Sequence, residues 1–366
     1  MSAIPFVLCD DPISFYTALH VLQSSSAIVL DCEGLNLGTQ HGQLSLLSLR
    51  PLFPSPSTPS QNYIFDFLTL PNTLLPPLFT LLSSPSILKI VFDGRMDFSA
   101  LYHSYRVELV NVLDLQLVDV ASRFMRGESA DCRGKHRKRL GGCFGYGVVG
   151  RERAVFEKVH VLNGLGQCLV EHGCVRGRAE GKKQVDHDIW TTRPLPLQHL
   201  QYAAHDVELI HILHSHFSNE NYIVPHLSVL LYQSKLYVSL WSDAPPVPGD
   251  DYRSHPLLPL EIISAQSPTI DGLLKSTTPS VVCKGCLRSL TLGSFPVVNT
   301  RDGVVSEFCI VCYVLPIYLE MKRMRRERIE RDKEERERKR SERQELELVT
   351  RTSRDESVGR ARASSM

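Results

Sequence analysis

The sequence predicts an α/β domain with a mixed central sheet flanked by helices, followed by a small metal-binding module and a long charged helix. Three observations support this order. Strand-like apolar segments first follow one another directly and then alternate with helical segments, two Cys-x-x-Cys pairs come after a proline-rich stretch, and the C-terminal region is densely charged. Consecutive strands favour antiparallel pairing and strand–helix alternation favours parallel pairing, so one sheet is expected to contain both.

The composition is that of a globular chain with room for a large core. Its 366 residues are 43% hydrophobic and 22% charged, and the net charge of +1 gives no overall attraction to nucleic acid. Any basic surface therefore has to be local. The chain shows no apolar run of about 18 residues and no secretory signal at its start. We expect an intracellular protein, nuclear or cytoplasmic, that is neither secreted nor bound to a membrane.

The first half of the chain alternates between apolar strands and short helices. Strands are expected at 27–34, 43–51, 63–68, 88–93 and 110–113, and helices at 76–82, 96–105 and directly after the last strand. The glycines and polar residues before 43 indicate a turn, so the first two of these strands should pair as neighbours.

The second half begins with a segment of a different kind. Residues 127–150 combine the basic run RGKHRKR with the glycine-rich GGCFGYGVVG and are expected to form a mobile loop. Helical patterns return at 160–173, 196–217 and 221–240, with Pro196 suited to a helix start. The domains are expected at 5–242 for the α/β domain, 243–277 for a proline-rich linker, 278–316 for the metal-binding module, 317–348 for the charged helix and 349–366 for a disordered tail.

Two carboxylates end the strand AIVLDCEG. Strand side chains alternate between faces, so Asp31 and Glu33 should point the same way and repel each other unless a cation lies between them. A divalent metal would relieve the repulsion, although a buried strand that simply emerges into water would show the same pattern. Tyr202 precedes Asp206 by one helical turn, which places the phenol and the carboxylate on one face.

These residues belong to three ordered motifs. DCEG at 31–34, FDGRMDFSAL at 92–101 and YAAHD at 202–206 resemble the motifs of the DEDD superfamily of 3'-5' exonucleases. The connecting segments NVLDLQ, LNGLGQCLVEHG and WTTRP are similar to the ribonuclease D branch, and the Asp-Gly-Arg-x-Asp pattern resembles Egalitarian-like domains. Tyr202, with Gln201 where the histidine variant has His, indicates the tyrosine subtype. Phe92 departs from the His that many relatives carry.

The resemblance covers about residues 5 to 240 and implies a ribonuclease H-like fold and a two-metal active site. The implied catalytic residues are Asp31, Glu33, Asp97, Tyr202 and Asp206, and the four carboxylates would hold two Mg²⁺ or Mn²⁺ ions. It implies that Asp31 bridges both ions and that Tyr202 orients the attacking water. The implied activity is hydrolysis of phosphodiester bonds from the 3' end, with RNA favoured over DNA and single-stranded ends as substrates. The alternative is a scaffold that uses the same fold to bind nucleic acid or a protein without cleavage.

The basic run is the one local candidate for contact with nucleic acid. Five cations could track phosphates, although a short basic run is also typical of a solvated loop or an import signal. These candidate contacts are Arg133, Lys135, Arg137, Lys138 and Arg139.

Four of the ten cysteines form two Cys-x-x-Cys pairs separated by 22 residues. Cys283, Cys286, Cys309 and Cys312 have the spacing of a Cys₄ zinc site, in a segment too poor in apolar residues to fold without metal. We therefore expect one structural Zn²⁺ in a zinc-ribbon-like module; unrelated free cysteines are the alternative. Residues 317–348 lack an apolar heptad, so a solvent-exposed helix is expected rather than a coiled coil. Either part could bind a protein partner.

Overall fold

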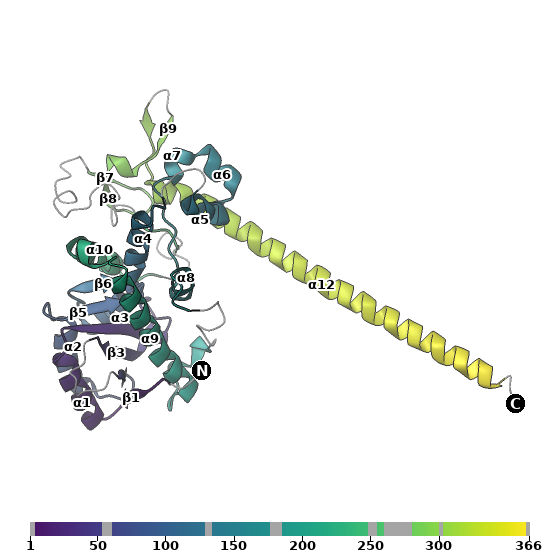
Figure 1. The fold of residues 1–366 in the computed structure, drawn as a ribbon, viewed down its shortest axis with the longest axis horizontal. Coiled ribbons are helices and arrows are strands. Elements are labelled where there is room, and N and C mark those ends of the chain that lie inside the picture. The colour runs from purple at the N-terminus through teal and green to yellow at the C-terminus, as the bar shows by residue number, and fades with distance from the viewer. Residues whose placement is uncertain are drawn as a thin grey trace.

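A six-stranded mixed sheet forms the centre of the α/β domain (Figure 1). The computed structural model describes residues 4–52, 61–128, 134–175, 185–247, 255–259, 280–299 and 303–363. The sheet has the order β1-β4-β3-β2-β5-β6. Its strands are β1 (Phe6–Cys9), β2 (Ala27–Leu35), β3 (Gln43–Pro51), β4 (Asn62–Asp66), β5 (Leu88–Val91) and β6 (Val112–Asp114).

The pairing confirms the predicted mixture of directions. The strand β2 runs antiparallel to β3 and parallel to β5, while β6 continues the parallel half and β1 adds to β4 in parallel. The edge strand β1 and the helix α1 (Pro12–Gln23) were not predicted. A signal for the helix is present, because Asp11 accepts hydrogen bonds from the backbone of Ile13 and Ser14 and Pro12 occupies the first turn.

Helices cover both faces of the sheet. On one face lie α1, α2 (Pro76–Leu82) and α3 (Arg95–Tyr105), and on the other lie α4 (Leu115–Met125), α8 (Leu165–Glu171) and α9 (Leu197–Asn219). In β2, Ile28 and Leu30 pack toward the first layer and Val29 packs toward the second. Because strand side chains alternate between faces, the residues that follow Val29 at intervals of two, Asp31 and Glu33, also face α9.

The helix α9 begins after Pro196, as expected, and the predicted helix at 221–240 is α10 (Leu227–Val238). Among the described residues, no helix is long and apolar enough to cross a membrane.

The prediction of a mobile loop at 127–150 is wrong for the residues that the structure describes. Three helices occupy this part of the chain: α5 (Lys135–Phe144), α6 (Tyr146–Arg151) and α7 (Arg153–Phe156). Their apolar side chains share one core with the cysteine-containing module. This core includes Phe144 and Phe156 from the helices and Cys309 from the module. Burial in that core outweighs the low helix propensity of the glycines.

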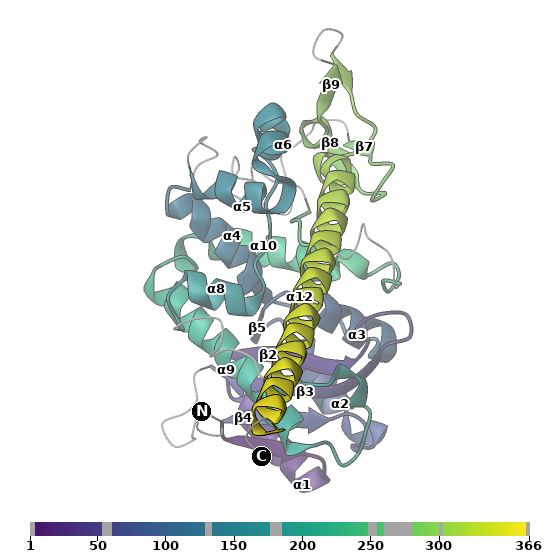
Figure 2. The ribbon, with the colours of Figure 1, turned by 90° about the vertical axis from the view of Figure 1, so that its right-hand side faces the viewer.

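The C-terminal module consists of two short hairpins and the start of a long helix. Strand β7 (Ser280–Val282) pairs with β8 (Ser289–Thr291), β9 (Val297–Asn299) pairs with β10 (Val304–Val305), and α12 spans Ile310–Ala363. Figure 1 shows α12 extending away from the rest of the molecule as a single helix, and in Figure 2 the same helix points toward the viewer. Most of the predicted linker lies outside the described residues, but Leu257 bridges to Val161.

Two predicted boundaries in this region are corrected. The helix α12 begins inside the predicted module instead of at 317, and it continues to Ala363, so the prediction of a disordered tail at 349–366 is wrong as far as Ala363. Extending a helix costs far less than starting one, so a polar segment attached to an existing helix can remain helical. Ion pairs one turn apart, such as that between Arg323 and Glu327, accompany the charged part of α12.

Candidate active site

The carboxylates of Asp31 and Glu33 lie on the face of β2 that packs against α9. This confirms the expectation that both point the same way. The register between β2 and β3 shifts after Glu33, which pairs with Leu46 while Gly34 pairs with Leu44. A Cβ atom on Gly34 would lie 2.1 Å from the carbonyl oxygen of Gln43, so only glycine fits there. The irregularity bends the strand directly after the two acids.

The helix α9 brings a third carboxylate to this strand end. Ala203, Ala204 and Val207 bury one side of α9 against the sheet, which fixes the helix close to β2. Asp206 is 5% exposed and Glu33 is 9% exposed. One carboxylate oxygen from each of Asp31, Glu33 and Asp206 lies within 4.8 Å of the others. Residues from two distant segments therefore form one acidic cluster.

Asp97 lies next to this cluster without belonging to it. It sits in the first turn of α3, and its Oδ1 accepts a hydrogen bond of 2.7 Å from the backbone N–H of Cys32, the residue between the two strand acids. Burial raises the pKa of Asp97 to about 6, even though hydrogen bonds from Cys32 act against the shift. Asp97 thus fixes the backbone that carries Asp31 and Glu33.

A polar network that sequence reasoning missed holds the start of α3. Arg95 forms two hydrogen bonds with Asp93, and its guanidinium lies 4.8 Å from the ring centre of Tyr237. Asp114 accepts hydrogen bonds from the backbone of Asp93 and Gly94. Burial raises the pKa of Asp114 to about 7. The signal for this network in the sequence is the Asp-Gly-Arg-x-Asp motif, from which only Asp97 was predicted to have a role in the site.

Tyr202 lies one turn before Asp206 and is packed by the segment that precedes α9. Its ring centre lies 6.1 Å from that of the fully buried Trp190. Arg193 fixes this segment to the sheet through two hydrogen bonds of 2.6 Å to Asp66. The WTTRP segment, which contributed only to the resemblance, therefore supports the tyrosine.

The chemistry of the acidic cluster fits a hard divalent cation. Carboxylate oxygens are the ligands that Mg²⁺ and Mn²⁺ prefer. Three carboxylates within 4.8 Å of one another repel, and a bound cation would remove that repulsion. The residues present therefore suit the divalent metal ions that the resemblance implies.

The four cysteines also come together as predicted. One sulfur from each of Cys283, Cys286, Cys309 and Cys312 lies within 4.8 Å of the others. The backbone N–H groups of Gly285 and Cys309 donate to the Cys283 sulfur, and thiols of Cys309 and Cys312 hold the pKa of Cys286 well below its ordinary value. Four sulfurs at this spacing fit a closed, tetrahedral zinc site.

The described cations of the basic run lie in different environments. Arg133 lies outside the described residues. Lys135 and Lys138 are exposed, and Arg137 is half-buried. Arg139 is held instead by Glu128 and Glu171.

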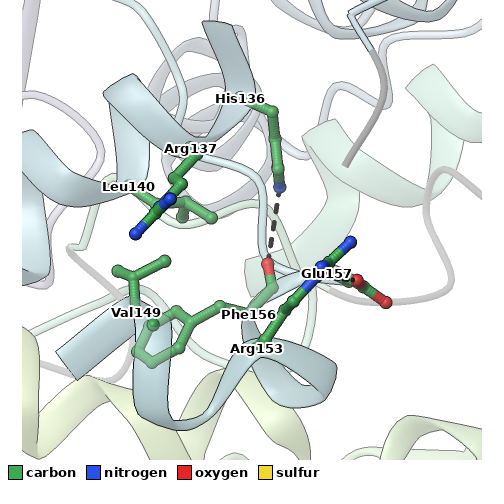
Figure 3. A pocket seen from close by; sticks show the side chains of 8 residues that line it. His136, Arg137, Leu140, Val149, Arg153, Phe156 and Glu157 are labelled. Atoms are coloured by element: carbon green, nitrogen blue, oxygen red, sulfur yellow. Dashed lines mark hydrogen bonds and ion pairs between the residues drawn. The ribbon is translucent and has the colours of Figure 1, made fainter. Parts of the chain in front are cut away.

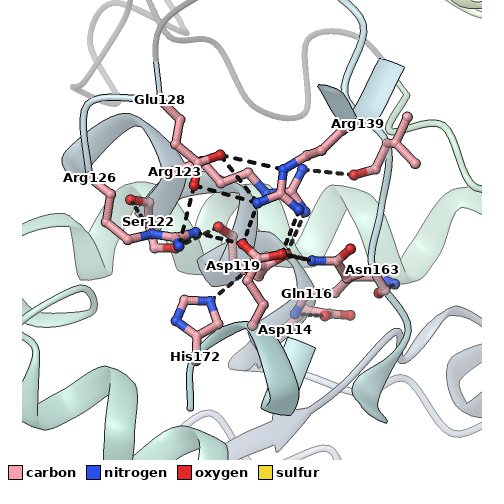
Figure 4. Close-up of polar contacts among 12 residues, drawn as sticks. Asp114, Gln116, Asp119, Ser122, Arg123, Arg126, Glu128, Arg139, Asn163 and His172 are labelled. Atoms are coloured by element: carbon pink, nitrogen blue, oxygen red, sulfur yellow. Dashed lines mark hydrogen bonds and ion pairs between the residues drawn. The ribbon is translucent and has the colours of Figure 1, made fainter. Parts of the chain in front are cut away.

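The pair that holds Arg139 belongs to a larger network around the buried Asp119 (Figure 4). Asp119 accepts from Arg123 at 2.6 Å and from His172 at 2.9 Å, while Arg126 binds Glu171 at 3.0 Å. Arg139 is therefore part of the structural support of the domain.

Fold and site together define a nuclease-type α/β domain with a carboxylate cluster at a strand end. The 3'-5' exonuclease family model matches residues 7–221, and the chain belongs to this family. This confirms the prediction of a 3'-5' exonuclease domain.

Particular relatives are more distant. The chain is 26% identical over 200 residues to the piRNA biogenesis protein EXD1 of Mus musculus, covering 52% of this chain and 29% of that protein. It is 34% identical over 107 residues to EXD1 of Xenopus laevis, covering 29% of this chain and 22% of that protein. The chain thus matches less than a third of the length of these curated relatives.

One solved structure shares the fold over most of both chains. The Trypanosoma brucei RNase D complex with RNA U12 has a TM-score of 0.52 and 23% identity, covering 70% of this chain and 77% of that one. The expected ribonuclease H-like architecture is confirmed.

Proposed function

We propose that this chain is a 3'-5' exonuclease that hydrolyses phosphodiester bonds with two divalent metal ions and favours RNA. The observation that carries the proposal is the cluster of Asp31, Glu33 and Asp206, whose oxygens lie within 4.8 Å of one another. Asp97 supports the same strand from α3, and Tyr202 lies one helical turn from Asp206. A family domain with all five of these positions filled has the groups that the reaction requires.

The divalent ions, when bound, would supply an activated water and neutralise charge on the phosphoryl oxygens and the departing 3' oxygen. The chain's own residues provide the geometry. Asp31, Glu33 and Asp206 would hold the ions, and Asp97 keeps the spacing of the strand acids by accepting the Cys32 N–H. We assign Tyr202 to orienting the attacking water, because a phenol with an ordinary pKa of about 10 is a poor general base at neutral pH.

The preference for RNA rests on relatives. The curated proteins that the chain resembles are named for piRNA biogenesis, and the solved structure with the shared fold contains RNA.

The test is cleavage of matched RNA and DNA oligonucleotides by the full chain, with and without added Mg²⁺. A 5'-labelled strand should shorten progressively and a 3'-labelled strand should release labelled mononucleotide at once, with RNA degraded faster. Asp31→Asn should abolish both reactions. The exposed Asp10 provides a matched control, because Asp10→Asn removes the same charge from a residue outside the cluster.

Metal-loaded wild-type protein that leaves both strands intact would refute the proposal. If that protein still bound the strands, the scaffold alternative would replace it.

We also propose that the cysteine cluster holds one structural Zn²⁺. The support is the closeness of the four sulfurs and their burial in the core shared with α5 and α7. A site with four protein ligands leaves no open position for substrate, so it stabilises the fold and does not catalyse.

A further inference from the structure

A cavity of about 230 Å³ lies among α5, α6 and α7, in the part of the chain between the second and third exonuclease motifs (Figure 3). None of the proposed catalytic residues lines it. The cavity therefore lies outside the groups that the proposed reaction uses.

The floor of the cavity is apolar and firmly packed. Leu140, Val149 and Phe156 line it and are each no more than 5% exposed. The ring of Phe156 contacts that of Phe144 edge-on, with centres 4.8 Å apart. These side chains belong to the core that contains the four cysteines. The floor is therefore held in place by packing against the cysteine module.

The rest of the lining is polar and carries more positive than negative charge. Arg137 and Arg153 line the cavity with a single carboxylate, that of Glu157, which binds Arg153 at 2.9 Å. In Figure 3 the guanidinium of Arg137 extends toward Val149, across the apolar floor. Burial lowers the pKa of His136, whose Nε2 faces the carbonyl oxygen of Phe156, so the imidazole is neutral at pH 7.

The cations of α5 divide into three groups. Arg139 is fixed by Glu128 and Glu171, whereas Lys135 and Lys138 are exposed to solvent. Arg137 alone among them lines the cavity. The helix α5 thus places the guanidinium of Arg137 at the cavity and the exposed ammonium groups of Lys135 and Lys138 outside its lining.

We propose that this cavity binds one nucleotide, with the base against the apolar floor and the phosphate against Arg137. An apolar floor with an aromatic ring suits a flat base, and a guanidinium binds phosphate through paired hydrogen bonds. The volume is below the roughly 300–1,000 Å³ of drug-sized sites, which fits a single base. The nucleotide could belong to a single strand or be a free mononucleotide. The strand source rests on the proposed function, because it assumes that nucleic acid is the substrate.

Two glycines of α6 provide a matched pair of variants. A Cβ atom on Gly150 would point at the Nη2 of Arg137 from 3.7 Å, so Gly150→Leu fills the cavity without changing its charge. A Cβ on Gly147 meets nothing within 4 Å, so Gly147→Leu adds the same side chain to the same helix outside the cavity. A second pair tests charge: Arg137→Gln inside the cavity and Arg336→Gln at an exposed position of α12.

Binding is measured in the full-length, zinc-loaded Asp31→Asn protein without added Mg²⁺. One arm uses fluorescence anisotropy with a labelled single-stranded RNA, and the other uses calorimetric titration with AMP and UMP. Gly150→Leu and Arg137→Gln should weaken binding about 5- to 10-fold, whereas the two control variants should stay within about 2-fold. Circular dichroism checks that each variant is folded. If Gly150→Leu does not fold, the comparison of Arg137→Gln with its control decides the test.

The arms identify the source of the nucleotide. If the cavity variants weaken only RNA binding, the cavity holds a nucleotide of the RNA strand. If they weaken only the binding of AMP and UMP, the cavity holds a free mononucleotide. Unchanged binding of both ligands by the folded cavity variants overturns the proposal. Because no cleavage is measured, a chain that cleaves nothing and shows this pattern would refute the exonuclease proposal and keep the cavity proposal.

Discussion

The carboxylate cluster and the cysteine cluster both gather metal-binding atoms, but they differ in the number and type of their ligands. Each brings its ligand atoms within 4.8 Å of one another. The acids come from a strand and a distant helix and offer three hard oxygens, whereas the cysteines come from the turn after β7 and the start of α12 and offer four soft sulfurs. Three ligands leave coordination positions for water and substrate, and four tetrahedral ligands leave none. Ligand number and type thus separate a reactive centre from a structural one.

The network around Asp119 shows a third way to accommodate closely spaced metal-binding or acidic side chains, which is neutralisation by cations of the same chain. There the acids Asp119, Glu128 and Glu171 are held by arginines and His172 from the same chain. Although Asp119, Cys168 and His172 also lie within 4.8 Å of one another, hydrogen bonds from Arg123 and His172 already lower the pKa of the buried Asp119 carboxyl against the effect of burial. Charge neutralised within the chain needs no metal.

Removal of zinc should have the largest effect. Structural zinc contributes binding free energy of the order of 10 kcal/mol to small domains, so Cys309→Ser should release the metal and loosen α5 and α7, which share its core. Elemental analysis would measure zinc, and amide hydrogen exchange would report on α5 and α7. Cys143→Ser is the control, because that cysteine lies outside the cluster. Slow exchange in zinc-free protein would contradict the coupling.

Glu33→Gln should have the next largest effect, on catalysis and not on folding. Loss of one carboxylate from the cluster should reduce RNA cleavage about 10³-fold, equivalent to about 4 kcal/mol of transition-state stabilisation. Thermal stability without Mg²⁺ should stay equal or rise, because one of three repelling charges is gone. Glu108→Gln, at an exposed position, should change neither property. Lost stability with full activity would remove the distinction between the clusters.

Asp119→Asn should show the opposite pattern with a smaller effect. Breaking a buried ion pair leaves Arg123, which is 4% exposed, without its charge partner, and this should lower the free energy of unfolding by about 3 kcal/mol. Urea titration would measure the change, and cleavage per folded molecule should be retained. Glu335→Gln breaks an exposed pair with Lys339 and should leave the urea midpoint unchanged. An unchanged midpoint for Asp119→Asn would show that the network is not structural.

Local patterns were sufficient for much of the sheet and for the shared face of Asp31 and Glu33. The strand β3 and the helix α2 have the predicted bounds, because apolar runs framed by proline and polar residues are local signals. The strand period places Asp31 and Glu33 on one face, and the helical period places Tyr202 beside Asp206. That Asp206 joins the two strand acids was implied only by the resemblance to the exonuclease motifs, because no local pattern shows which distant segments touch.

The errors occurred where distant contacts decide the structure. The glycines of residues 127–150 indicate a loop locally, but Leu140 and Phe144 pack with Ile310, far along the sequence. The role of Arg139 likewise depends on Glu171, which no short window includes. The fixing of α3 by Tyr237 depends on a residue well over a hundred positions beyond it.

The shared core of α5, α7 and the cysteine module also sets how this chain can be shortened or rearranged. The two halves of that core lie on either side of the last exonuclease motif, so no single cut separates the catalytic segment from the module cleanly. A chain ending near residue 260 would keep the proposed catalytic residues and expose the apolar side chains of Leu140, Phe144 and Phe156, a surface prone to aggregation. The helices α5 to α7 and the cysteine module are therefore expected to fold and unfold together.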